Sequence, residues 1–193
     1  MKNKSKADLI LILVFAALSI SAGANFALGA SKEEERKELR KSTQETLSRL
    51  YANQPKSKSA VENAAGYAAF SNFGMKILLA GGGRGKGIAF NNRTKTETFM
   101  KMAELQAGLG FGVKKFRVVF VFENQGVFDE FVNSGWEIGG QATAAAKLSD
   151  QGGAFAGAFS IKPGVWMYQL TDDGLALELT AKGTKYYKDK DLN

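Results

Sequence analysis

The chain of 193 residues contains no cysteine, no histidine and only two prolines. Without cysteine it can form neither a structural disulfide nor a lipid-modified cysteine after a signal peptide. The absence of both cysteine and histidine also removes the commonest general base, Ser-His and thiol nucleophiles, and most zinc-ligand sets. We therefore expect no metal, no cofactor and no catalytic centre of these classes.

Carboxylates are the remaining groups for acid–base chemistry. Asp129 and Glu130 are neighbours on an expected helix, where adjacent side chains diverge, and Asp172-Asp173 fits a turn. Two carboxylates that converge across a sheet, as in a glycosidase, are the alternative that the sequence leaves open. On balance we expect no enzyme.

The first thirty residues have the pattern of a secretory signal peptide. Three lysines precede the apolar run Leu9–Ile20, and the small residues Ala22–Ala24 follow it. Cleavage is expected before Asn25, with a second site after Gly29; an uncleaved anchor is the competing interpretation, because the apolar stretch continues beyond Ile20. The prediction is a signal peptide over residues 1–24 and an exported protein of a bacterial envelope, periplasmic or secreted, either soluble or peripherally bound to a membrane.

The charge balance is basic. The formal net charge is +7, to which residues 1–24 contribute three lysines and one aspartate. A positive balance favours anionic partners such as anionic phospholipid at a membrane surface, although solubility alone also accounts for it. Nucleic acid is not expected as a partner, because the basic residues form no dense stripe and the protein is predicted to be exported.

Two helices are predicted before the strands. The segment 31–53 begins with a capping box at Ser31 and Glu34, and its apolar residues keep helical spacing beside a densely charged face. Such an amphipathic helix docks on its own domain, on a partner or on a membrane surface. After Pro55, a second helix is expected with Ser59 as its N-cap.

From about Tyr67 the apolar pattern changes to a period of two, which is typical of strands. Strands are expected over residues 115–122, 154–161, 165–171 and 175–181. Turns are expected at Lys162-Pro163-Gly164 and at 172–174, and a helix around Val127–Val132 ends at Gly135. The pattern predicts an α+β fold: N-terminal helices followed by a mostly antiparallel β-sheet or partly closed barrel with one inserted helix.

The glycine-rich stretch "GGGRGKG", residues 81–87, invites a nucleotide-binding interpretation. A Walker A loop counted back from Lys86 requires glycine at position 80 and a hydroxyl at position 87, where this chain has Ala80 and Gly87. The dinucleotide spacing Gly-x-Gly-x-x-Gly fails as well, and no helix N-terminus follows to receive a phosphate. We instead expect a glycine-rich turn that enters a strand, with the glycines serving tight chain geometry or close packing.

Basic residues with aromatic neighbours are the remaining sign of a binding site. They are expected at strand ends and turns, where they would form an anion-binding rim. The candidates are Arg84, Lys86, Lys114, Lys115 and Arg117. The alternative interpretation is that these are solvated strand ends whose charge prevents edge-to-edge pairing.

Four segments together resemble the SYLF domain family, a family of lipid-binding domains. They are "AAGYAAF" (64–70), "GGGRGKGIAF" (81–90), "LQAGLGFGVKKFRVVFVFEN" (105–124) and "FVNSGWEIGGQATAAA" (131–146). Their order and spacing are specific in combination, although Ser71 stands where proline is usual, a departure expected to alter a turn. The resemblance implies a SYLF-like domain over residues 57–193, preceded by an amphipathic helix and linker over 25–56.

The function implied by this resemblance is non-catalytic lipid binding. The same five basic residues, with the amphipathic helix before the domain, would meet the bilayer. We therefore expect a domain of the bacterial envelope that associates with anionic membrane lipid. The alternative is a structural or protein-interaction module without lipid specificity, whose partner is an envelope protein.

Overall fold

The computed structural model describes residues 6–71, 82–105, 117–139, 147–148, 153–172, 174–175 and 184–193. The chain divides into two compact units, residues 1–38 and 39–193, and each is described by itself. The first unit holds the beginning of helix α1 (Lys6–Asn53), where Arg36 Nη1 lies 3.2 Å from Glu33 Oε2. In the described ranges, no helix combines the length and hydropathy needed to cross a bilayer.

The starts of the first two helices differ from the sequence prediction. α1 runs through Ser31, so the predicted N-cap at this residue is wrong. No proline occurs before Pro55, and serine is only mildly unfavourable inside a helix, so nothing in the sequence forces a break. α2 (Ser57–Asn63) also begins before its predicted cap, and the Ser59 hydroxyl instead accepts a 3.0 Å hydrogen bond from the Asn63 side chain.

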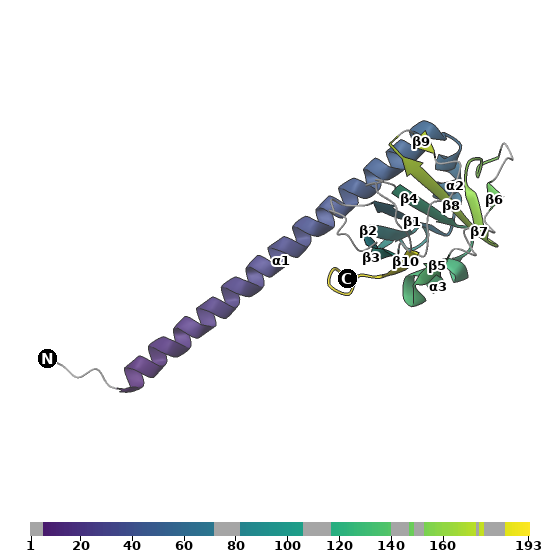
Figure 1. Ribbon diagram of the computed structural model, residues 1–193. Helices are drawn as coiled ribbons and strands as arrows, with labels where there is room; N and C mark the ends of the chain where they lie inside the picture. Colours follow the sequence, from purple (N-terminus) through teal and green to yellow (C-terminus); the bar gives the residue numbers. More distant parts are fainter. Residues whose placement is uncertain are drawn as a thin grey trace. The chain divides into compact units, whose positions relative to one another are not determined.

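The strands form one antiparallel sheet (Figure 1). They are β1 (Gly66–Ser71), β2 (Gly82–Asn91), β3 (Thr96–Leu105), β4 (Arg117–Phe122), β5 (Trp136–Ile138), β6 (Lys147–Leu148), β7 (Phe159–Lys162), β8 (Val165–Thr171), β9 (Gly174–Leu175) and β10 (Thr184–Lys188). Their order is β5-β10-β3-β2-β1-β4-β8-β7-β6, with β9 paired to β8. The sheet forms a barrel that is only partly closed, because the two end strands, β5 and β6, do not pair with each other in the described residues. With α3 (Gln125–Ser134) as the inserted helix, the predicted α+β fold is confirmed.

The second half of the sheet follows the sequence prediction with one exception. Strand β8, the turn at Pro163 and Gly164, and the hairpin from Thr171 to Gly174 are confirmed. The strand predicted over 154–161 starts only at Phe159, because the chain turns over 153–157, where Gly157 has a φ of 75°. Residues 176–181 of the last predicted strand lie outside the described ranges.

Each face of the sheet carries its own hydrophobic core, because successive side chains of a strand point to opposite faces. On the α1 face, Leu50 of α1 and Val61 of α2 pack on Ala69, Val119 and other buried sheet residues. On the α3 face, the aromatic side chains of the sheet pack against α3; they are Phe70, Phe120, Phe122 and Tyr186 with Phe128 and Phe131. Figure 1 shows α2 and α3 on opposite sides of the sheet.

Residues 82–87 of the glycine-rich stretch lie within strand β2, so the predicted glycine-rich turn is wrong. Gly85 and Gly87 fall on the α3 face, whereas Lys86 faces α1 with its cross-strand neighbour Ser71. A Cβ atom added at Gly87 would meet the backbone oxygen of Ala69 and would lie 2.6 Å from the Phe70 ring. The missing side chain of Gly87 therefore makes room for the Phe70 ring in the core of the α3 face.

Candidate functional site

A group of basic side chains lies on the α1 face, and we call it the basic face. Its members are Arg84, Lys86, Lys101, Arg117 and Lys185. Lys86 of β2 lies opposite Lys101 on one side and opposite Ser71 on the other. Ser71 in turn lies opposite Arg117 of β4. Since directly opposed residues of antiparallel strands point to the same face, these residues form one row across the sheet.

Arg84 and Lys185 form a second row beside the first. Both lie opposite Ala103 of β3, on its two sides, so a small side chain separates their two charges. α1 reaches the first row at Ser71, whose hydroxyl is 2.7 Å from the hydroxyl of Ser42. Arg84 and Lys185 are exposed, whereas Lys86 is half-buried. The second row is therefore the more accessible part of the basic face.

The structure places the sequence candidates differently from the prediction. Arg84 and Lys86 lie inside β2 rather than at a strand end or turn, because the glycines before them belong to the same strand. Arg117 is the first residue of β4, as expected for a strand end. Lys114 and Lys115 lie outside the described residues. Three of the five candidates are thus brought together on one face.

Lys101 and Lys185 were missed by the sequence analysis, yet a signal for Lys101 was present. The Asn91 side chain accepts hydrogen bonds from the backbone amides of Arg93 and Thr94, at 2.9 and 3.0 Å, and fixes the β2–β3 turn. Asn91 therefore pairs with Thr96, and counting back along both strands places Lys86 opposite Lys101. A register count from a turn beginning at Asn91 would have found this pair.

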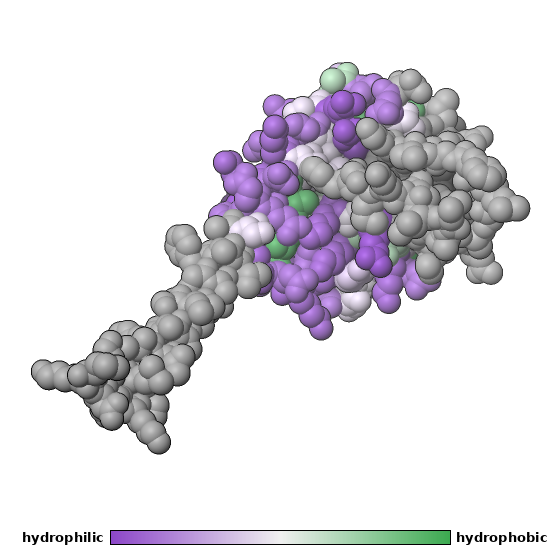
Figure 2. Space-filling model, turned by 60° about the vertical axis from the view of Figure 1, so that its left-hand side comes forward, coloured by the Kyte–Doolittle hydropathy of each residue, from purple (hydrophilic) through white to green (hydrophobic). Residues whose placement is uncertain are grey.

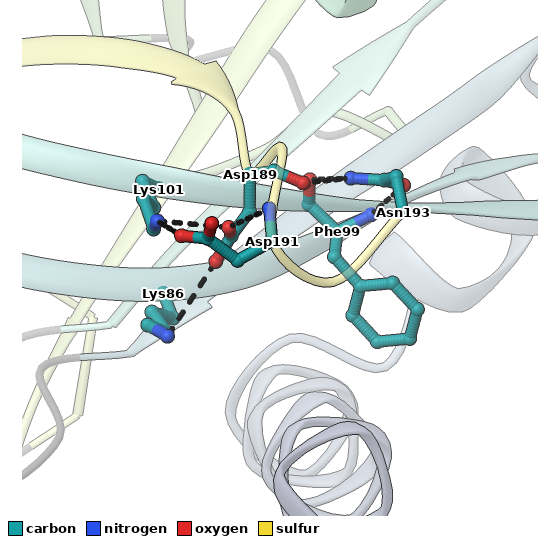
Figure 3. Close-up of polar contacts among 6 residues, drawn as sticks. All are labelled: Lys86, Phe99, Lys101, Asp189, Asp191 and Asn193. Atoms are coloured by element: carbon teal, nitrogen blue, oxygen red, sulfur yellow. Dashed lines mark hydrogen bonds and ion pairs between the residues drawn. The ribbon is translucent and has the colours of Figure 1, made fainter. Parts of the chain in front are cut away.

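Two carboxylates bind the lysine pair of the first row (Figure 3). Asp189, with a residual exposure of 1%, lies with Oδ1 2.8 Å from Lys101 Nζ and with Oδ2 3.4 Å from Lys86 Nζ. Asp191 Oδ2 lies 2.7 Å from Lys101 Nζ. The hydrogen bonds that Lys101 donates to Asp189, and then to Asp191, raise the pKa of Lys101 above its ordinary value. Lys101 therefore stays charged at neutral pH, and its charge is compensated within the protein.

The carboxylates belong to residues 189–193, which we call the C-terminal segment. The Asn193 side chain accepts a 3.0 Å hydrogen bond from the Phe99 amide and donates a 2.9 Å bond to the Phe99 oxygen. Leu192 is buried in a small cluster with Leu39, Ile88 and Phe99. The Asp189 amide also donates a 2.9 Å hydrogen bond to the Phe99 oxygen, so the segment extends the pairing of β10 with β3 beyond the end of the strand.

The other three members of the basic face have no such compensation from the part of the chain that the structure describes. Within the described ranges, no ion pair involves Arg84, Arg117 or Lys185, although Glu137 is the cross-strand neighbour of Lys185. Figure 2 shows a described surface that is mostly hydrophilic, with small hydrophobic spots. Among the described residues, the one large hydrophobic side chain that is exposed is Tyr187, at 38%. This surface is suited to electrostatic contact with an anion rather than to burial of a broad apolar patch.

Metal chemistry finds no support in the same ranges. No three His, Cys, Asp or Glu side chains among the residues described gather where they could hold a metal ion.

Comparison with known proteins identifies a relative of this chain. Over 148 residues the chain is 34% identical to Beta cell expansion factor A from Aeromonas veronii, a match that covers 76% of this chain and 54% of that protein. The chain therefore spans about half the length of the curated relative that it matches. No family model matches the sequence.

Proposed function

We propose that this chain is a member of the SYLF domain family, exported to the bacterial envelope, and that it binds anionic lipid at a membrane surface without catalysing a reaction. The observation that carries the proposal is the charge of Arg84, Arg117 and Lys185 on one face of the sheet, which no carboxylate of the described residues compensates. The SYLF resemblance of the sequence supports it independently.

The charges are sufficient for reversible binding. Each Lys or Arg near an anionic membrane surface contributes about 1 kcal/mol, so three contribute about 3 kcal/mol, or roughly a hundredfold in affinity. Because the attraction acts across water, it weakens as salt screens it. A peripheral protein that dissociates at high ionic strength is the expected behaviour.

Vesicle co-sedimentation tests the proposal. The chain beginning at Asn25, the predicted mature form, is mixed with phosphatidylcholine vesicles that contain or lack phosphatidylglycerol. We expect binding only to the anionic vesicles, and a loss of about fivefold in affinity for Arg84→Gln and for Lys185→Gln, since each removes about 1 kcal/mol of attraction.

Lys58→Gln is the matched control. It removes the same charge from an exposed lysine of α2, which is 60% exposed and lies 3.8 Å from Glu62. We expect this variant to bind like the unaltered chain. Binding that is indifferent to anionic lipid, or that falls equally in all three variants, contradicts the proposal. Stable capture of one protein partner at high salt would favour the protein-interaction alternative instead.

A further inference from the structure

We propose that Lys86 and Lys101 form a latent phosphate-binding site, which the C-terminal segment occupies with the Asp189 carboxylate. A phosphate group, from a lipid headgroup or free in solution, would compete with Asp189 for the two ammonium groups. Where the phosphate belongs to a lipid, this inference rests on the proposed function. The exchange of the Asp189 carboxylate for phosphate at the two lysines does not itself require a membrane.

The first argument is the placement of the two lysines. They lie directly opposite each other on adjacent strands, an arrangement that is destabilising for like charges unless an anion lies between them. The protein supplies such an anion and buries it, with Asp189 1% exposed. The pair therefore has the charge and geometry of an anion site.

The second argument is that Asp189 contacts the two lysines at unequal distances. Lys101 has short contacts to Asp189 and Asp191, at 2.8 and 2.7 Å, whereas the Lys86 ammonium is 3.4 Å from Asp189 Oδ2. That oxygen accepts no hydrogen bond within the described part of the chain, although it is buried. A phosphate dianion has more oxygens and more charge than a carboxylate, so it is able to contact both ammonium groups at short range.

The third argument is that the C-terminal segment lies beyond the last residue of β10 that is paired in the sheet. Strand β10 ends at Lys188, and the segment beyond it is held by a 2.9 Å hydrogen bond from the Asp189 amide to the Phe99 oxygen, by the Asn193 contacts with Phe99 and by burial of Leu192. Releasing these contacts leaves the pairing of β10 with β3 from Thr184 to Lys188 intact. Figure 3 shows the segment as a short loop that brings Asp189 and Asp191 against the two lysines.

The consequence is a change in the charge that the basic face presents. With the segment in place, Lys86 and Lys101 are compensated, and the accessible charge is that of Arg84, Arg117 and Lys185. With the segment displaced by phosphate, the two lysines join them in binding the anion. An anionic ligand would thus bind to the basic face and would also make the charges of Lys86 and Lys101 available to it.

The test uses the full chain and inorganic phosphate as the probe. Amide hydrogen exchange over residues 189–193, followed by mass spectrometry, should accelerate as phosphate is added, and sodium chloride at equal ionic strength should produce a smaller effect. Asp189→Asn removes the internal anion and keeps the side-chain shape, so we expect it to bind phosphate about tenfold more tightly. Asp172→Asn, an exposed turn residue with the same charge change, should leave phosphate affinity unchanged.

Lys86→Gln supplies the second line of evidence, because its half-exposed side chain is removable without opening the core. Phosphate should no longer accelerate exchange in this variant. The proposal is overturned if phosphate and chloride act alike on the unaltered chain, if Lys86→Gln responds fully, or if a folded Asp189→Asn gains no affinity. If Asp189→Asn does not fold, the first two results decide the question.

Anionic vesicles form the second arm of the experiment. Phosphatidylglycerol vesicles that accelerate exchange in the C-terminal segment identify a lipid headgroup as a source of the phosphate group. A response to inorganic phosphate with none to vesicles identifies free phosphate, upholds the latent site and counts against the proposed membrane function. The unaltered chain could also bind vesicles while exchange in residues 189–193 responds to neither probe. That result overturns the latent site and leaves the proposed membrane function unaffected.

Discussion

Replacing Gly87 by alanine is expected to destabilise the protein, because this position has no room for a side chain. The added Cβ would meet the Ala69 backbone oxygen and would lie 2.6 and 2.9 Å from two atoms of the Phe70 ring. The ring has little freedom to move away, since its centroid lies 4.9 Å from that of Tyr186 and 6.2 Å from that of Phe120.

The magnitude follows from two opposing terms. Overpacking a well-packed core costs about 1–3 kcal/mol, and backbone contact places this site at the upper end. Replacing glycine inside a strand gains about 0.5–1 kcal/mol of chain entropy. The expected net loss in the free energy of unfolding is about 2 kcal/mol, which lowers the midpoint of urea unfolding by about 1 M for a protein of this size.

Urea unfolding followed by tryptophan fluorescence measures this loss. Gly126→Ala is the control, because a Cβ there would have its nearest neighbour at 3.8 Å and the residue lies inside α3. It should stabilise the protein by about 0.5–1 kcal/mol. If Gly87→Ala is as stable as the unaltered chain, the packing explanation is wrong and the glycines serve another purpose, such as access of a ligand to the β2 backbone.

Two further predictions concern single contacts. Asn124→Ala should lower the free energy of unfolding by about 1 kcal/mol, because the Asn124 side chain accepts a 3.0 Å hydrogen bond from the Val127 amide and caps α3; thermal unfolding checks it, and an unchanged midpoint would contradict it. Asp189 and Asp191 raise the pKa of Lys101 above 10.5, so their contribution to stability is complete below pH 10.5 and is lost as the pH rises further. Lys101→Met should therefore be less stable than the unaltered chain at neutral pH, with the difference shrinking above pH 10.5, as measured by urea unfolding at each pH.

The parts of the fold that were predictable from sequence are those with a local signal. The hydrophobic alternation of β4, the helix end at Gly135 and the turn at Gly164 each depend on neighbouring residues, and the structure confirms all three. Helix starts were less predictable, because the pattern of a serine followed by an acidic residue occurs both at the N-terminus of a helix and in the interior of a longer one. Ser31 shows this, since α1 continues through it.

The candidate site was only partly predictable, because its members meet through strand pairing. Lys185 lies a hundred residues beyond Arg84 in the chain, and the two meet only because β10 and β2 flank β3. The compensation of Lys86 by Asp189 is equally non-local. No spacing within the sequence distinguishes a lysine whose charge is compensated from one that is available to a ligand.

The alternating residues of β2 determine both how the core of the α3 face packs and where the positive charge of the basic face lies. Gly87 makes room for the Phe70 ring on one face, where Gly85 also lies, while Arg84 and Lys86 carry charge on the other. A shift of the strand by a single residue would move both basic side chains into the aromatic core and leave the glycines on the basic face. Burying two charges among aromatic rings is far more costly than any single hydrogen bond, so the glycine–basic alternation itself selects the register. The stretch that resembles a phosphate loop thus has a structural role. Its alternation of glycine with basic residues determines which face of β2 is apolar, and it thereby places Arg84 and Lys86 on the basic face.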